Sequence, residues 1–168
     1  CRFNEKFCSN CVPVFPEPQA LLSKTPSIMG LDGTQKMSKS RGNAIMLCAT
    51  EDETAALIKK AKTDADRHIT YEPINRPEVA NLLMLISLCT GEDPQLIAEQ
   101  IGDGGGGMLK KNLTEVLNDQ LRPLRQRRMQ LEKNPYYIRQ VLLDGSQRAR
   151  EIAAKTLDEV RTAMNMVI

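Results

Sequence analysis

The sequence predicts a mostly α-helical protein in which the end of an α/β domain is followed by an all-α helical bundle. A short apolar run at residues 27–31 lies between Pro26 and an Asp-Gly pair, and has the length of a buried strand. From residue 50 onward, apolar residues recur at helical spacing between helix-start and helix-stop signals. One strand before a bundle fits two consecutive domains, which we place at residues 1–48 and 49–168.

The first domain is expected to contain little regular structure besides that strand. The first 24 residues are expected to be irregular, because three prolines between residues 13 and 18 block both helix and central strand. Residues 27–31 are expected to form a buried strand or the end of one. Residues 32–47 are rich in Gly, Ser, Lys and Asn, and they predict an exposed loop.

Local start and stop signals divide the next segment into three helices. These signals are the capping-box pair Thr50 and Glu53, Pro77 at a first helical position, Gly91 as a stop, and the pair Asp93-Pro94 as a new start.

Two longer helical stretches complete the chain. After Gly104–Gly107, apolar residues with a period of about 3.6 predict one long helix to about Lys133, and Pro123 within it can introduce a kink. An Asn-Pro pair at residues 134–135 starts the next helix, which is expected to end at Asp144-Gly145 and to be followed by a last one. The side chains expected to point inward are Leu109, Leu113, Val116, Leu117, Leu121 and Leu124 in the long helix, and Ile152, Ala153, Leu157, Val160 and Met164 in the last.

Composition excludes several classes of protein. The chain has 168 residues, 23 Lys and Arg against 21 Asp and Glu, and a net charge of +2, which is ordinary for a globular protein. No apolar run approaches the ~20 residues of a membrane span, so no membrane partner is expected. The single histidine excludes two-histidine zinc centres, and the absence of Trp disfavours an aromatic RNA-stacking surface. Because the chain begins at Cys1 without a recognisable signal cleavage site, we expect it to be the back part of a longer protein.

The sharpest local feature is a cluster of cationic and hydroxyl side chains, called the KMSKS loop below: Lys36-Met37-Ser38-Lys39-Ser40. A lysine ammonium is a point charge on a flexible stem, which suits a phosphate whose charge changes during a reaction. The serine hydroxyls and loop amides add neutral donors. By residue types alone, a solvated basic loop or a phosphorylation substrate is the commoner explanation.

The order of the surrounding motifs favours the functional explanation. The motifs before the loop are Arg2-Phe3-Asn4-Glu5-Lys6-Phe7, Phe15-Pro16-Glu17-Pro18 and Ile28-Met29-Gly30-Leu31-Asp32-Gly33-Thr34, and those after it are Ala61-Lys62-Thr63-Asp64, Ile69-Thr70-Tyr71, Asn81-Leu82-Leu83, Leu121-Arg122-Pro123 and Leu143-Asp144-Gly145. The KMSKS loop is the signature of class I aminoacyl-tRNA synthetases, and with these motifs in this order essentially the whole chain resembles bacterial tryptophanyl-tRNA synthetases. Tyrosyl-tRNA synthetases share the loop but agree less in the helical region.

This resemblance implies a ligase that joins L-tryptophan to ATP, releases pyrophosphate, and transfers the aminoacyl group to tRNA(Trp). ATP is then a substrate with Mg²⁺, and no tightly bound cofactor or protein-held metal is expected. Residues 1–48 become the C-terminal remnant of the Rossmann-type nucleotide-binding catalytic domain, carrying the KMSKS loop. Residues 49–168 become the helical anticodon-binding domain. A cytoplasmic location and a homodimer of the full-length protein are also implied.

The same resemblance assigns residues to ATP. Lys36 and Lys39 are the expected catalytic residues, because preorganised cations beside a departing pyrophosphate stabilise the transition state more than the ground state. Lys39 is preferred for the transition-state contact. For Ile28 and Met29, whose backbone would hold adenine, a plain core strand is an equally good explanation. The expected ATP-binding set is Ile28, Met29, Lys36, Met37, Ser38, Lys39 and Ser40.

The long helix is the expected place for tRNA contacts. Its basic residues outnumber its acidic ones, and Arg125 and Arg128 lie three apart on what the spacing indicates is the solvated side. Contacts from such arginines to phosphates would supply salt-dependent affinity rather than sequence reading. A simple solvated helix face is the alternative.

Two other readings of the whole chain stay open. One is a fragment of a tyrosyl-type synthetase, because the amino-acid pocket is not among these residues. The other is a non-catalytic helical RNA-binding or regulatory protein that retains the loop. The sequence upstream separates them, since the enzyme requires a nucleotide-binding domain with a His-containing phosphate motif.

The remaining motifs have ordinary explanations. Cys1, Cys8 and Cys11 have the spacing of three metal or iron–sulfur ligands, but structural or incidental cysteines are favoured. The glycines at residues 104–107 are expected to form a flexible turn, because no Gly-Lys-Ser/Thr follows them. His68 is expected to be exposed, with no evident partner and no catalytic role.

Overall fold

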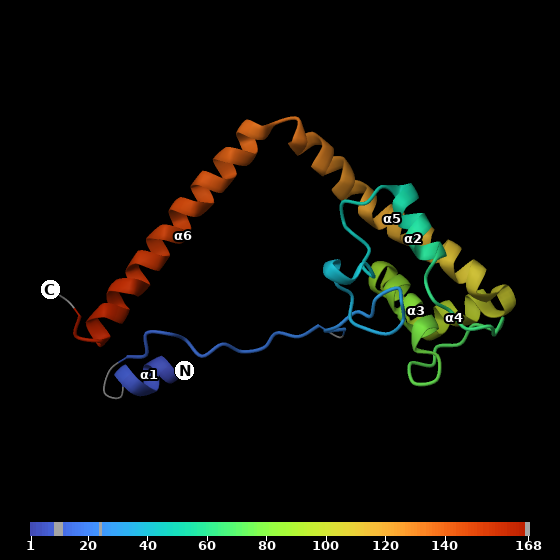
Figure 1. Ribbon diagram of the computed structural model, residues 1–168, viewed down its shortest axis with the longest axis horizontal. Helices are drawn as coiled ribbons and strands as arrows, with labels where there is room; N and C mark the ends of the chain where they lie inside the picture. Colours follow the sequence, from blue (N-terminus) through green and yellow to red (C-terminus); the bar gives the residue numbers. More distant parts are fainter. Residues whose placement is uncertain (9–11, 24, 167–168) are drawn as a thin grey trace. The chain divides into compact units, whose positions relative to one another are not determined.

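The computed structural model describes residues 1–8, 12–23 and 25–166, which divide into two compact units (Figure 1). One unit comprises Ser23–Met129, and the other combines Cys1–Leu22 with Gln130–Ile168. The mostly helical architecture expected from the sequence is confirmed. The domain boundary expected after residue 48 stays a prediction.

Long connecting segments separate α1, α2 and α3, whereas the helices from α3 onward follow one another with short connections. Among the described residues the α-helices are α1 (Arg2–Phe7), α2 (Glu51–Lys59), α3 (Pro77–Thr90), α4 (Pro94–Ile101), α5 (Gly105–Glu132) and α6 (Pro135–Ala163), and the 3-10 turns are η1 (Lys39–Arg41) and η2 (Gly102–Gly104). No helix of the described chain is long and apolar enough to cross a membrane.

The local start and stop signals are confirmed. Thr50 Oγ1 accepts a hydrogen bond from the Glu53 amide at 3.1 Å, and Glu53 Oε2 accepts one from the Thr50 amide at 2.8 Å, so both sides of the capping box are present. Pro77 is the first residue of α3. Gly91 ends the helix with a φ of +80°, a backbone conformation that is strained for a residue with a side chain. Asp93 caps α4 through the Gln95 amide. These signals are short-range chemistry, which explains why the sequence alone revealed them.

The core of the unit Ser23–Met129 lies where α2, α3, α4 and α5 meet. Burying each of its large aliphatic side chains stabilises the fold by roughly 1.5–3 kcal/mol. The most deeply buried of these side chains are Ile58, Ile69, Val79, Leu82, Leu83, Ile86, Ile97, Leu109 and Leu113.

The strand expected at residues 27–31 is replaced by a single antiparallel bridge between Met29 and Lys36. The Gly30 amide donates to the Gln35 carbonyl at 2.8 Å, and the Met37 amide donates to the Ile28 carbonyl at 2.9 Å. A strand requires a partner along its length, and in the described chain only this short return segment pairs with it. The expectation of a strand here is therefore corrected to a bridged turn.

The N-terminal segment is more ordered than expected. Residues 2–7 form α1, so the prediction that the whole stretch to residue 24 is irregular is wrong at its start. The Phe3 ring lies 5.0 Å from that of Phe7 and 5.2 Å from that of Phe15, and these contacts anchor the short helix. The prolines that motivated the prediction all lie beyond α1.

Two glycine signals were also misleading. Gly145 was expected to end a helix, but α6 runs through it without interruption. An interior glycine costs about 1 kcal/mol relative to alanine, which is too little to break a helix that no proline follows. The expected flexible turn at residues 104–107 is instead the end of η2 and the first turn of α5.

The apolar stripe expected on the last helix is not buried. None of the described residues of α6 is buried, and Ile152 and Leu157 are 70% and 47% exposed. Helical spacing identifies which side chains share a face, but it does not supply the surface that covers them.

Candidate functional site

The KMSKS loop lies on a closed turn. The Leu31 amide donates to the Asn43 carbonyl at 3.0 Å, which joins the two ends of residues 31–43. Within that turn Lys39–Arg41 form η1, and Gly42 follows with a φ of +67°. The closure fixes the loop backbone at its base.

Both lysines of the loop and one of its two serines face solvent. Lys36, Lys39 and Ser40 are exposed, whereas Met37 and Ser38 are half-buried. The Ser38 and Ser40 hydroxyls lie 3.0 Å apart and share a hydrogen bond. Loop lysines with exposed ammonium groups, flanked by hydroxyls, can bind an anion such as a phosphate.

Asn43 fills the centre of this turn. Its side chain is buried, with 6% exposure, although the loop around it is polar. Oδ1 of Asn43 accepts from the Ser38 amide at 2.8 Å. Nδ2 donates to Asp32 Oδ2 at 3.0 Å and, more weakly, to the Lys36 carbonyl at 3.5 Å. One amide group therefore bonds both halves of the turn.

Gly30 and Asp32 complete this arrangement. A Cβ added to Gly30 would lie 2.2 Å from Asn43 Nδ2, so a side chain at position 30 would displace the asparagine. The hydrogen bond from Asn43 lowers the pKa of the Asp32 carboxyl, and the bond from the Thr34 amide lowers it further. Sequence reasoning missed these residues as a group. The signal was the pair of turn dipeptides, Asp32-Gly33 and Gly42-Asn43, that bracket the loop.

A hollow of about 380 Å³ adjoins the KMSKS loop within the unit Ser23–Met129. Met37, Ser38 and Lys39 of the loop line it, together with Leu124 and Arg128 of α5. The hollow places a loop lysine and a helix arginine around one space. The remaining lining residues are Ala44, Ile45, Met46, Leu47 and Cys48.

Ile28 and Met29 are half-buried, and their carbonyls already have partners. The Ile28 carbonyl accepts from the Met37 amide, and the Met29 carbonyl accepts from Asn81 Nδ2 of α3 at 3.0 Å. These bonds tie the base of the loop to the helical core. The expected adenine contact of this backbone stays a prediction.

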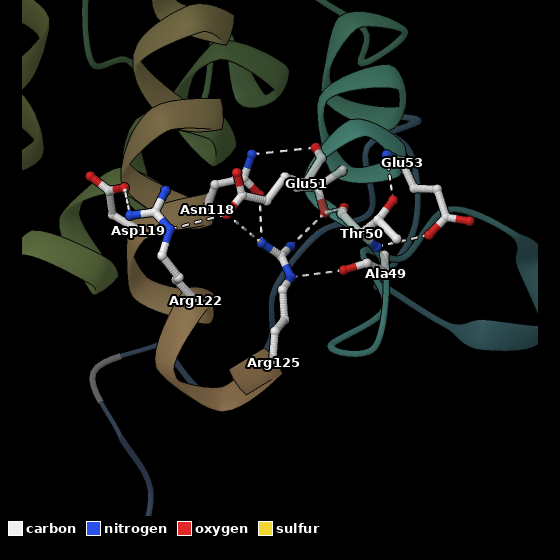
Figure 2. A network of polar contacts seen from close by, with 9 residues as sticks. Ala49, Thr50, Glu51, Glu53, Asn118, Asp119, Arg122 and Arg125 are labelled. Carbon is white, nitrogen blue, oxygen red and sulfur yellow. Dashed lines mark hydrogen bonds and ion pairs between the residues drawn. The ribbon is translucent and has the colours of Figure 1, made fainter. Parts of the chain in front are cut away.

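Arg125 lies in a polar network that joins α5 to the start of α2 (Figure 2). Its guanidinium donates to the Ala49 carbonyl at 2.8 Å, to Asn118 Oδ1 at 2.9 Å and to Thr54 Oγ1 at 2.9 Å. The side chain is only 13% exposed, which corrects the expectation that it lies on the solvated side of α5. The spacing of seven between Asn118 and Arg125, on the face that also carries Leu121, was the sequence signal for this network.

Neighbouring charges on α5 differ from Arg125 in exposure. Arg122 is 49% exposed and pairs with Glu51 at 3.1 Å and with Asp119 at 2.7 Å (Figure 2). Arg128 is exposed and lines the hollow beside the KMSKS loop. Of the two arginines predicted to contact tRNA, only Arg128 is thus placed at an open surface. The tRNA contacts of both stay predictions.

His68 has a partner that the sequence did not reveal. Its Nδ1 lies 2.7 Å from Asp103 Oδ1, and both side chains are exposed. The expectation that His68 is exposed is confirmed, and the statement that it has no partner is wrong. The partner lies 35 residues away in the sequence, so no local pattern could indicate it.

Arg76 organises the connection between α2 and α3. It forms a bidentate ion pair with Asp64, Nε to Oδ2 and Nη2 to Oδ1, both at 2.7 Å. Its Nη1 also donates to the His68 carbonyl and to Thr70 Oγ1. The guanidinium lowers the pKa of the Asp64 carboxyl, chiefly through the hydrogen bonds.

Metal ligation has no support in the described part of the chain. Across residues 1–8, 12–23 and 25–166, no group of three His, Cys, Asp or Glu side chains is placed to hold a metal ion. Cys11, the third cysteine of the spacing noted above, lies outside the described residues.

The loop, the helices behind it and the sequence together define a class of protein. A family model described as tRNA synthetases class I (W and Y) matches residues 1–122, and the chain belongs to this family.

Its curated relatives are tryptophan–tRNA ligases. The chain is 40% identical over 158 residues to that of Aquifex aeolicus (strain VF5), a match that covers 91% of this chain and 39% of the relative. It is 34% identical over 172 residues to that of Thermosynechococcus vestitus, covering 99% of this chain and 52% of the relative. The chain therefore spans about half the length of the relatives it matches, or less.

Solved structures of tryptophanyl-tRNA synthetases have a similar fold. Tryptophanyl-tRNA synthetase from Mycoplasma pneumoniae superposes with a TM-score of 0.77 at 25% identity, covering 99% of this chain and 50% of that one. The enzyme from Campylobacter jejuni, solved with ADP and tryptophan, superposes with a TM-score of 0.69 at 23% identity, which supports the fold.

Proposed function

We propose that this chain is the C-terminal part of a tryptophan–tRNA ligase, in which it supplies the KMSKS loop and the helices that bind the tRNA anticodon. The observation that carries the proposal is the exposed pair Lys36 and Lys39, held on a closed turn, in a chain whose curated relatives are tryptophan–tRNA ligases over nearly its full length. Residues 1–48 end the Rossmann-type catalytic domain, and residues 49–168 form the helical domain.

The proposed chemistry is the activation of L-tryptophan by ATP, with Mg²⁺ accompanying the ATP as part of the substrate. A carboxylate oxygen of tryptophan attacks the α-phosphorus, and the bond between that phosphorus and the bridging oxygen breaks. The electron pair of the broken bond leaves with pyrophosphate. Negative charge therefore grows on the pyrophosphate oxygens in the transition state, where fixed cations are most effective.

Lys36 and Lys39 supply those cations. Their ammonium groups extend from a backbone that internal hydrogen bonds hold in place, so little reorganisation is needed as the charge moves. Ser38, Ser40 and the Met37 amide add neutral donors to the phosphates. The backbone of Ile28 and Met29, at the base of the same turn, contacts adenine.

The helical half is proposed to bind tRNA(Trp), to which the enzyme transfers the activated amino acid. Of Arg125 and Arg128, the two arginines expected to contact tRNA, Arg128 is the better placed, because it is exposed beside the hollow at the KMSKS loop. A phosphate contact at Arg125 would have to compete with its bonds to Ala49, Thr54 and Asn118.

The test is amino-acid-dependent exchange between pyrophosphate and ATP by the whole protein that contains this chain. Exchange that requires tryptophan supports the proposal. Exchange that requires tyrosine instead would assign the chain to the tyrosyl-type enzymes. Binding of tRNA with no exchange for either amino acid would leave the non-catalytic RNA-binding protein as the explanation.

A further inference from the structure

We infer that Asn43, with Asp32 as its partner, is a positioning residue that holds the KMSKS loop in the shape that presents Lys36 and Lys39 to phosphate. The inference deepens the proposed function and rests on it. Neither residue is proposed to touch the substrate.

The first support is how completely the Asn43 amide is used. Its oxygen accepts from the Ser38 amide, and its two N–H groups donate to Asp32 Oδ2 and to the Lys36 carbonyl. The bonded groups lie at Lys36 itself and at Ser38, directly before Lys39. One side chain therefore fixes the backbone next to both lysines.

The second support is burial. Asn43 is 6% exposed, and a buried amide is stable only when its polar atoms are bonded. Gly30 leaves room for it, since any Cβ there would lie 2.2 Å from Nδ2. The turn is thus built around an asparagine rather than an apolar core.

The third support is a contrast between backbone and side chains. Within the described residues, the Lys36 and Lys39 ammonium groups have no hydrogen bond or ion pair, while the backbone that carries them is bonded at several points. This arrangement leaves the charges available to a ligand and removes the freedom of the chain that bears them. Preorganisation of this kind serves catalysis more than ground-state binding.

The pair allows a sharp test, because the donor and the acceptor can be exchanged. Asn43→Asp keeps an acceptor for the Ser38 amide, but it loses the donor to Asp32 and sets two carboxylates about 3 Å apart. Asp32→Asn alone removes the charged acceptor. Combining the two substitutions restores a donor–acceptor pair of the opposite polarity.

In the whole protein we expect Asn43→Asp to lower kcat for tryptophan-dependent ATP–pyrophosphate exchange by about 10²-fold, with KM for tryptophan unchanged. The double substitution should recover most of that loss. The matched control is Asn75→Asp, which removes the same kind of amide donor, here to Glu72 Oε2 at 3.0 Å, far along the chain from the loop. The control should leave kcat unchanged.

A second readout separates this inference from the proposed function. Hydrogen exchange at the Ser38 amide in the 168-residue chain should accelerate in Asn43→Asp and slow again in the double variant. The melting temperature of the chain should be unchanged in both variants. If the unsubstituted whole protein shows no tryptophan-dependent ATP–pyrophosphate exchange, the proposed function is overturned. If Asn43→Asp leaves kcat unchanged, or leaves the rate of hydrogen exchange at the Ser38 amide unchanged, the positioning role is overturned.

Discussion

At the scale of single residues, Arg125 links α5 to the start of α2. Removing its guanidinium leaves the Ala49 carbonyl, the Asn118 amide oxygen and the Thr54 hydroxyl without a donor in a poorly solvated place. Arg125→Ala is therefore expected to lower the free energy of unfolding by about 2–3 kcal/mol. Urea unfolding of the 168-residue chain measures it.

A neighbour on the same helix provides the control. Arg122 is 49% exposed, and surface ion pairs contribute little, so Arg122→Ala should lower the free energy of unfolding much less than Arg125→Ala does. Equal losses in the two variants would mean that the Arg125 network adds nothing beyond an ordinary surface charge.

Asp64 gives a residue-scale prediction about pH. Its pKa is lowered from an ordinary 3.8 by Arg76, so the folded state favours the ionised carboxylate. The resulting stability is present at neutral pH, begins to decline as pH approaches 3.8, and is lost as pH falls through the folded pKa. Asp64→Asn should therefore destabilise the chain at pH 7 and lose that effect at strongly acidic pH. Denaturant midpoints measured at both pH values decide this, and an equal deficit at both would contradict the ionic origin.

At the scale of elements, α6 is continuous through Gly145. Apart from its chain neighbours and the backbone of its own helix, no atom of the described residues lies within 4 Å of a Cβ added there, so alanine can enter the helix without a clash. Gly145→Ala should raise helix stability by roughly 0.5–1 kcal/mol, because it removes the conformational freedom of an interior glycine. Thermal unfolding followed by helical circular dichroism reports this change. A loss of stability would instead indicate that the helix breaks there, as the sequence signal first suggested.

On α5, the residues that form the buried face show which part of the structure the sequence could predict and which part it could not. The spacing of Leu117, Leu121 and Leu124 indicated the inward side, and Leu121 is indeed buried, but Leu124 is 44% exposed. The buried face continues through Arg125, which is only 13% exposed. The spacing of apolar residues predicts only which apolar side chains share a face of α5. It cannot predict that α5 also buries an arginine where carbonyl and hydroxyl oxygens at the start of α2 pack against it.

The same helix carries the prediction about tRNA. Arg128→Ala in the whole protein should weaken tRNA(Trp) binding and reduce its salt slope by about one unit, without changing the exchange reaction. Arg67→Ala, an exposed arginine in a connecting loop, is the control. Titrations of labelled tRNA at two salt concentrations distinguish the variants. Curves that coincide for Arg128→Ala, the control and the unsubstituted protein would remove Arg128 from the tRNA surface.

For the candidate site, the sequence identified the lysines but not what holds them. Lys36 and Lys39 belong to a contiguous motif, which a linear pattern can display. Asn43, Asp32 and Gly30 act together only once the turn closes, and no spacing rule specifies that closure. The expected strand at residues 27–31 failed for a related reason, because a strand depends on partners elsewhere in the fold.

At the scale of the whole molecule, the chain matches about half or less of each curated relative's length. The resemblance assigns no amino-acid pocket to these residues, so the 168 residues alone are expected to show no tryptophan-dependent ATP–pyrophosphate exchange. Radiolabelled pyrophosphate exchange, with the whole protein as the positive control, measures this. Exchange by the isolated chain would show that a complete active site lies within it.

The central claim is that the KMSKS loop stabilises the transition state of adenylate formation, and Lys39→Ala in the whole protein tests it most directly. The measurement is the single-turnover rate of tryptophanyl-adenylate formation across a range of ATP concentrations, which separates the rate of the step from the affinity for ATP. The loss of one preorganised electrostatic contact predicts a rate lower by roughly 10²–10³-fold, with a much smaller change in ATP affinity. An unchanged maximal rate, with the whole loss in ATP affinity, would show uniform binding by Lys39 and contradict the claim.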